Sequence, residues 1–87
     1  MEANKIIITG AATRMGAAIA KKLSGPGVEM IIHYNRSKSE AEKLQKELLK
    51  NKTKVYLIKG DLAKEQDLKK IINFSKSKLK YFDCLIN

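Results

Sequence analysis

The chain has 87 residues, of which 44% are hydrophobic and 31% charged, a composition typical of one small folded domain rather than a disordered chain. Its single cysteine excludes a disulfide scaffold or a cysteine-based metal site, and no apolar run approaches the roughly 20 residues that span a bilayer. Lysine and arginine number 18 against 9 acidic residues, and this net charge of +9 suggests an anionic partner. The N-terminal run of three isoleucines is too short for a secretory signal, so we expect a cytoplasmic protein without membrane attachment.

The first half of the chain alternates strand and helix patterns. Three isoleucines at 6–8 end at Thr9-Gly10 and indicate a short buried strand. A helical pattern follows and stops at the turn 25–27, and residues 28–34 form a second strand pattern. The side chains expected to form the apolar stripe of the first helix are Met15, Ala18, Ile19 and Leu23.

The second half continues the alternation. Ser37 and Glu40 have capping-box spacing and predict the start of a helix that ends at 51–52. Residues 55–58 predict a third strand, 65–78 a third helix, and 82–86 the start of a fourth strand. The residues expected to face inward are Ala41, Leu44 and Leu48 in the second helix, and Leu68, Ile71, Ile72 and Ser75 in the third.

The order of these elements predicts an α/β fold. Parallel strands joined by right-handed helical crossovers form one βαβαβαβ half of a Rossmann-type, doubly wound sheet, with spatial strand order 3-2-1-4. The chain ends at an apolar strand with nothing to cover its far side. We therefore expect residues 1–87 to be an incomplete front segment of a longer domain.

The turn between the first strand and the first helix favours a phosphate site. Gly10 allows a sharp turn, Gly16 allows close packing of the helix on the sheet, and the N-terminus of the helix presents free N–H groups. The alternative is a small-residue turn that serves packing only.

This turn resembles that of the short-chain dehydrogenase/reductase family, T-G-x-x-x-G-x-G, through Thr9, Gly10 and Gly16. Arg14 replaces the middle glycine, as in the pteridine reductases, whose string T-G-A-A-x-R-[LM]-G includes Met15. The resemblance implies that Gly10, Met15 and Gly16 line the cofactor and that Arg14 contacts its phosphates. The alternative for Arg14 is a solvated charge on the first turn of a helix.

The end of the second strand indicates NADP(H) rather than NAD(H). An NAD site requires a carboxylate here, and none is present. The Arg36 guanidinium, the Ser37 hydroxyl and the N-terminus of the following helix suit a 2′-phosphate instead. The string H-Y-x-R-S of pteridine reductases implies cofactor contacts for His33, Tyr34, Asn35, Arg36 and Ser37. Ser37 also fits a helix cap, and His33 fits equally well a packed strand residue.

Two further strand ends match the family. Asp61 and Leu62 follow the third strand, where the resemblance implies binding of the adenine amino group; Asp61 alternatively is a turn or cap residue. The final residues, 83–87, resemble the start of D-x-L-[IV]-N-N-A-G, so Asn87 is the first asparagine of that motif and a cofactor contact.

The resemblance implies an NADPH-dependent oxidoreductase that transfers hydride to a pterin or a similar small carbonyl or imine substrate, and a homo-oligomeric full-length protein. The family's catalytic Ser, Tyr and Lys lie in its later half, so we assign no catalytic residue and expect these 87 residues to be inactive alone. One alternative is a carbonyl or acyl-carrier ketoreductase of the same family. Another is a small basic nucleic-acid-binding module, which the few aromatic residues disfavour.

Overall fold

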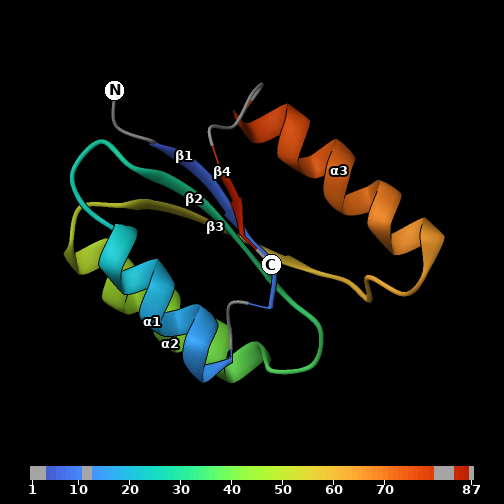
Figure 1. Cartoon of the computed structure of the whole chain (residues 1–87), viewed down its shortest axis with the longest axis horizontal. Helices are drawn as coiled ribbons and strands as arrows, with labels where there is room; N and C mark the ends of the chain where they lie inside the picture. The colour runs from blue at the N-terminus through green and yellow to red at the C-terminus, as the bar shows by residue number, and fades with distance from the viewer. Residues whose placement is uncertain (1–3, 11–12, 80–83, 87) are drawn as a thin grey trace.

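The computed structural model describes residues 4–10, 13–79 and 84–86, with side chains for the first two ranges. Strands and helices alternate along the chain (Figure 1). They are β1 (Lys5–Ile8), α1 (Arg14–Leu23), β2 (Glu29–Tyr34), α2 (Lys38–Lys50), β3 (Lys54–Lys59), α3 (Glu65–Leu79) and β4 (Cys84–Ile86). The predicted fold class is confirmed. None of the helices in these ranges is long and apolar enough to cross a membrane.

The four strands form one parallel sheet in the order β3-β2-β1-β4. Ile31 at the centre of β2 pairs with Ile7 of β1 on one side and with Tyr56 of β3 on the other. Successive side chains of a strand point to opposite faces of the sheet, so alternate residues of each strand share a face. The isoleucine runs of β1 and β2 therefore supply apolar side chains to both faces at once.

Helices cover both faces of the sheet: α1 and α2 lie on one face and α3 on the other (Figure 1). The first core comprises Ile6, Ile8, Ala20, Met30, Ile32, Leu44, Leu48 and Val55. The second comprises Ile7, Ile31 and Leu79, with Tyr56, Ile58 and Phe74 packed against them. The near-continuous apolar strands are explained by this burial on both sides.

The buried face of α1 differs from the predicted one. Gly16 and Ala20 are buried, whereas Met15 is 75% and Leu23 is 38% exposed. Ala18 is exposed as well, and only Ile19 of the predicted stripe is partly buried. Apolar spacing leaves more than one possible stripe on this helix, and tertiary packing buries the one with Gly16 and Ala20, of which Ala20 joins the core formed with β1 and β2.

The third helix is also rotated relative to the prediction. Ile71 and Ser75 are buried as expected, together with Leu79, but Leu68 and Ile72 are 41% and 44% exposed. The buried Ser75 hydroxyl donates to the Ile71 carbonyl over 2.8 Å, so it has a partner within the apolar layer. In α2, by contrast, the inward residues Ala41, Leu44 and Leu48 are as predicted.

The predicted capping box at the start of α2 is wrong. Ser37 occupies the N-cap position, but its side chain makes no capping hydrogen bond, because its ψ of 60° departs from the extended conformation of a capping residue. Glu40 lies 3.7 Å from Lys43 in an ion pair. The side-chain cap is found on α1, where Thr13 Oγ1 accepts the Gly16 N–H over 3.2 Å.

Candidate functional site

The candidate site lies along the edge of the sheet where its parallel strands end. There β1 leads into α1, β2 into α2 and β3 into α3, and the connecting turns begin near Gly10, Asn35 and Gly60. In a doubly wound sheet, ligands bind outside the carboxyl ends of the strands, at the point where the strand order reverses. Here that point lies beside β1, from which the chain runs first to β2 and β3 and finally to β4 on the other side.

Thr13 bonds back to Gly10 across the turn after β1. Its backbone N–H and its hydroxyl both donate to the Gly10 carbonyl, over 3.1 Å and 2.8 Å. Gly10 has φ +65°, a left-handed conformation that a residue with a Cβ adopts only at a cost. Gly16 is buried in the first turn of α1. Gly10 thus has the turn conformation predicted for it.

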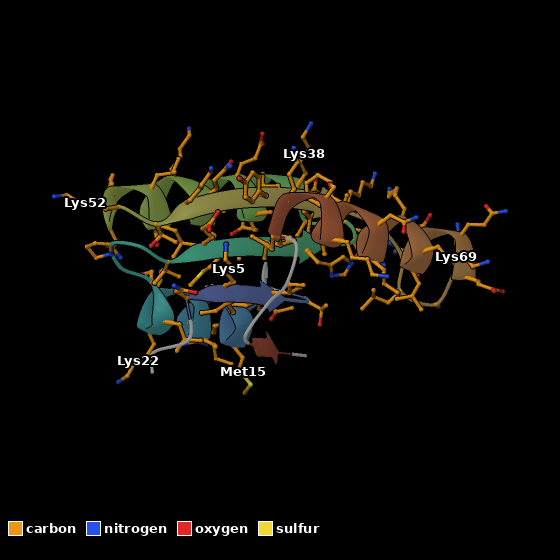
Figure 2. The ribbon with its side chains drawn as sticks, turned by 90° about the horizontal axis from the view of Figure 1, so that it is seen from above. Lys5, Met15, Lys22, Lys38, Lys52 and Lys69 are labelled. Atoms are coloured by element: carbon orange, nitrogen blue, oxygen red, sulfur yellow. The ribbon has the colours of Figure 1, made fainter. Side chains whose placement is uncertain are left out.

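A hollow of about 240 Å³ lies beside this turn. Gly10, Met15 and Gly16 line it, so three of the predicted contacts lie together. The Met15 side chain points away from the ribbon (Figure 2). An exposed thioether at the mouth of a hollow is an apolar surface for a ligand to pack against.

Arg14 lies apart from these residues. It lines a second hollow, of about 310 Å³, between α1 and α2, together with Glu40 and Glu47. Thr13 lines both hollows and separates them. The first turn of α1 contains no acidic residue, so the N–H dipoles and Arg14 make this helix end electropositive.

The five predicted contacts at the end of β2 divide into two groups. His33 and Tyr34 are buried, with 3% and 8% of their surface exposed, while Asn35, Arg36 and Ser37 are exposed. Both His33 ring nitrogens have backbone partners: Gly10 N–H donates to Nδ1 over 3.1 Å, and Nε2 lies 2.8 Å from the Gly60 carbonyl. Of the two alternatives for His33, the geometry matches the packed strand residue.

Asp61 organises the turn after β3. Its Oδ1 accepts the Ala63 N–H over 2.9 Å, and its own N–H donates to Asp67 Oδ2 over 2.9 Å. The sequence allows Asp61 either a contact with adenine or a role as a turn or cap residue, and these hydrogen bonds match the turn residue. Leu62, the next predicted contact, is 41% exposed.

A third hollow, of about 400 Å³, joins the ends of β2 and β3. Its lining residues are Asn35, Arg36, Lys59, Gly60, Asp61, Lys64 and Asp67. Lys59 and Lys64 were not predicted as site residues. A signal was present in the sequence, since these two lysines flank Gly60-Asp61 in a segment already identified as a strand end.

In the family that the sequence resembles, the catalytic Tyr and Lys have the spacing Tyr-x-x-x-Lys, and this spacing occurs once in the chain, at Tyr34 and Lys38. The Tyr34 side chain is buried at the end of β2, whereas Lys38 opens α2 and points outward (Figure 2). Tyr34 is thus the last residue of a strand and Lys38 the first residue of a helix, so the two do not share one helix face. We assign the pair no catalytic role. The predicted contact Asn87 lies outside the described residues.

Residues 4–87 match the family model described as short chain dehydrogenase. Versicolorin reductase 1 of Dothistroma septosporum is 31% identical over 77% of this chain and 26% of its own length. Dehydrogenase/reductase SDR family member 4 of Caenorhabditis elegans is 35% identical over 99% of this chain and 33% of its own length. The chain thus spans about a quarter to a third of these relatives.

Solved structures share the fold. A protein of Burkholderia cenocepacia, described as a dehydrogenase with bound NADP, has a TM-score of 0.87 at 25% identity, over 97% of this chain and 33% of its own. A short-chain dehydrogenase of Oenococcus oeni PSU-1 has a TM-score of 0.85 at 31% identity, over 97% of this chain and 39% of its own.

Proposed function

The chain belongs to the short chain dehydrogenase family, and we propose that it forms the NADP(H)-binding part of an oxidoreductase of that family. The observation that carries the proposal is the hollow at the ends of β2 and β3, where Arg36, Lys59 and Lys64 lie together. Three cations beside a strand end that lacks a carboxylate favour the dianionic 2′-phosphate of NADP(H) over the free ribose hydroxyl of NAD(H).

The acidic residues of this hollow are compatible with an anionic ligand. Asp61 and Asp67 each accept a backbone N–H within the turn, which offsets part of their negative charge locally. We assign to Asp61 a hydrogen bond that its carboxylate accepts from the adenine amino group, and to the backbone of Leu62 a supporting contact with the adenine. We also assign to the 2′-phosphate Asn35, which lines this hollow, and the exposed Ser37, which follows Arg36 in the chain.

The pyrophosphate of the cofactor fits the turn after β1. Gly10 and Gly16 line the hollow beside this turn, and the N-terminus of α1 favours negative charge. Arg14 adds a cation to the same helix end, and Met15 provides an apolar contact. When bound, the cofactor supplies hydride, and the residues of this chain hold and orient it.

The substrate belongs to the same proposal. Arg14-Met15-Gly16 and the string from His33 to Ser37 support a pteridine-reductase-like enzyme that reduces a pterin or a similar small carbonyl or imine compound. We further propose a cytoplasmic, homo-oligomeric full-length protein. The nucleic-acid alternative receives less support, because Lys22, Lys38, Lys52 and Lys69 project from separate parts of the surface instead of one face (Figure 2).

The proposal is tested by calorimetric titration of the chain with NADPH and with NADH. We expect NADPH to bind at least about tenfold more tightly, since a 2′-phosphate gains charge-assisted hydrogen bonds worth about 1.5–3 kcal/mol. Equal affinity for the two cofactors would contradict the NADP(H) assignment. Binding of neither, together with salt-sensitive binding of DNA, would support the nucleic-acid alternative instead.

A further inference from the structure

We propose that His33 is a positioning residue. It holds the turn after β1 and the turn after β3 at a fixed separation, so that one dinucleotide can contact both turns at the same time. The inference rests on the NADP(H)-binding function proposed above. The His33 side chain is buried, and the proposed function assigns it no direct contact with the ligand.

The position of His33 in the sheet makes this link possible. β2 lies between β1 and β3, and His33 pairs with Ile58 of β3 while its predecessor Ile32 pairs with Ile8 of β1. His33 is 3% exposed, and its ring lies between Gly10, the second residue after β1, and Gly60, the first residue after β3. Its Nδ1 accepts the Gly10 N–H over 3.1 Å, and its Nε2 lies 2.8 Å from the Gly60 carbonyl.

These two contacts require one tautomer. Because the Gly10 N–H is the donor, Nδ1 carries no hydrogen, and the ring proton is therefore on Nε2, from which it is donated to the Gly60 carbonyl. An apolar side chain here would leave both backbone groups without their partners. The Gly60 N–H in turn donates to the Tyr34 carbonyl over 3.0 Å, so Gly60 is bound to the end of β2 through both of its polar groups.

The two residues that His33 joins begin the two halves of the proposed site. Gly10 opens the turn assigned to the pyrophosphate, and Gly60 precedes Asp61 in the turn assigned to the adenine. When both turns are held in place before binding, less conformational entropy of the turns is lost on binding. Contacts at both ends of the ligand then contribute together to its affinity. Without the link, a ligand that contacts only one turn is affected less than a ligand that spans both.

Two amide variants separate the two hydrogen bonds. In His33→Asn the side-chain carbonyl can take the place of Nδ1 and accept from Gly10, and in His33→Gln the side-chain amide can take the place of Nε2 and donate to Gly60. His33→Phe retains a ring but removes both bonds. Thermal unfolding identifies which variants fold. If His33→Phe does not fold, the comparison of His33→Asn with His33→Gln still tests the proposal.

Two ligands and one spectroscopic signal provide the readout. We expect His33→Gln to weaken NADPH binding about tenfold and to change the affinity for adenosine 2′,5′-bisphosphate, which has only the adenine end, by less than about twofold. Amide hydrogen exchange at Gly10, followed by NMR, should be slow in the wild type and in His33→Asn and fast in His33→Gln. His33→Asn should accordingly retain more of the NADPH affinity than His33→Gln.

The outcomes distinguish this inference from the proposed function. If the wild type binds neither ligand, the NADP(H) function fails. If the wild type binds NADPH and a folded His33→Gln binds both ligands as tightly as the wild type, the positioning role is overturned. The positioning role is likewise overturned if His33→Gln weakens both ligands by the same factor, because that result indicates a purely structural residue.

Discussion

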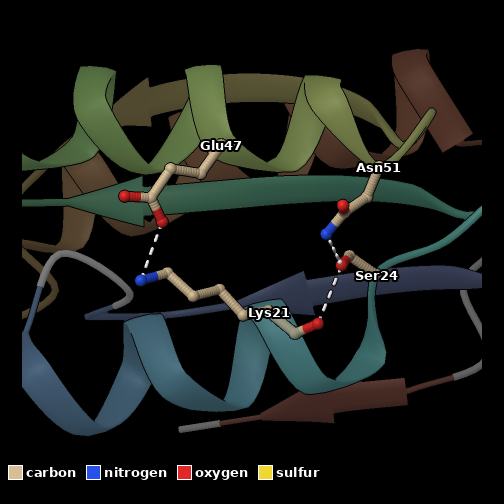
Figure 3. A network of polar contacts seen from close by, with 4 residues as sticks. All are labelled: Lys21, Ser24, Glu47 and Asn51. Atoms are coloured by element: carbon tan, nitrogen blue, oxygen red, sulfur yellow. Dashed lines mark hydrogen bonds and ion pairs between the residues drawn. The ribbon is translucent and has the colours of Figure 1, made fainter.

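The hydroxyl of Thr53 binds both backbone polar groups of Gly25. Oγ1 accepts the Gly25 N–H over 2.8 Å and donates to the Gly25 carbonyl over 3.3 Å. Thr53 precedes β3 and Gly25 follows α1, so one side chain joins two connections at the edge of the sheet opposite the candidate site. Beside it, Asn51 Nδ2 donates to Ser24 Oγ over 2.9 Å, and Ser24 donates to the Lys21 carbonyl over 2.8 Å (Figure 3).

Thr53→Val should destabilise the chain by about 1–3 kcal/mol, because Thr53 is only 2% exposed and the change leaves Gly25 without its side-chain partner. Thr53→Ser retains the hydroxyl and should lose less. Urea unfolding followed by circular dichroism measures both changes. A Val variant as stable as the wild type would show that water replaces the hydroxyl at no cost.

Gly10→Ala should cost about 1–2 kcal/mol, because φ of +65° places a Cβ in the left-handed region. Among the described residues, no atom beyond Gly10 and its chain neighbours lies within 4 Å of the added Cβ, so the cost arises from the backbone and not from a clash. Gly25→Ala is the matched control: its added Cβ also meets no atom within 4 Å, and Gly25 is not among the positive-φ residues. Equal effects of the two substitutions on urea unfolding would contradict the backbone explanation.

Gly60→Ala should destabilise the contact between β3 and α3. The added Cβ lies 2.9 Å from Ile71 Cδ1, and Ile71 is 5% exposed, so its side chain has little room to move. We expect a loss of about 1–3 kcal/mol in the wild type. In an Ile71→Val background, which lacks Cδ1, the same substitution should cost less. Additive free energies of unfolding in this double-mutant cycle would exclude the contact as the cause.

Arg36→Ala and Lys64→Ala should each weaken NADPH binding about tenfold and leave NADH binding unchanged, because the proposed contact is with the 2′-phosphate. Lys69→Ala removes one charge from the exposed surface of α3 without lining the hollow and controls for net charge (Figure 2). Titrations of all three variants with both cofactors provide the measurement. An equal loss for NADPH and NADH would assign these cations to the pyrophosphate instead.

The ion pair between Lys21 and Glu47 should contribute stability that depends on pH. The hydrogen bond from Lys21 lowers the pKa of Glu47 below its ordinary 4.5, and the two atoms Nζ and Oε2 lie 2.7 Å apart (Figure 3). A carboxyl with a lowered folded-state pKa stabilises the fold above its unfolded pKa and loses this contribution as pH falls through the folded value. Both side chains are half exposed, so the contribution is small and sensitive to salt.

Comparison of the wild type with Glu47→Gln measures this contribution. The wild type should have a slightly higher Tm at pH 7, and the difference should disappear as the pH falls below the pKa of Glu47. The difference should also shrink in high salt. A difference in Tm that is the same at pH 7 and in acid would indicate that the carboxylate charge plays no part.

Much of the architecture follows from local patterns in the sequence. The isoleucine runs at 6–8 and 31–32 predict strands buried on both faces, and the spacing of Ala41, Leu44 and Leu48 predicts the inward face of α2. The alternation of strand and helix is sufficient to place Gly10, Asn35 and Asp61 along one edge of the sheet, because parallel crossovers return each strand in the same direction.

The faces of α1 and α3 and the partners of His33 were decided only by the tertiary structure, which also brings Lys59 and Lys64 into one hollow with Arg36. Apolar spacing limits a helix to a few possible buried stripes, and the choice among them depends on packing against distant elements, which in α1 buries Gly16 and Ala20. The His33 ring bonds to residues 23 and 27 positions away in sequence. The sequence by itself determines where strands, helices and turns occur, whereas contacts between distant residues, formed only as the layers pack, decide which side chains share a site.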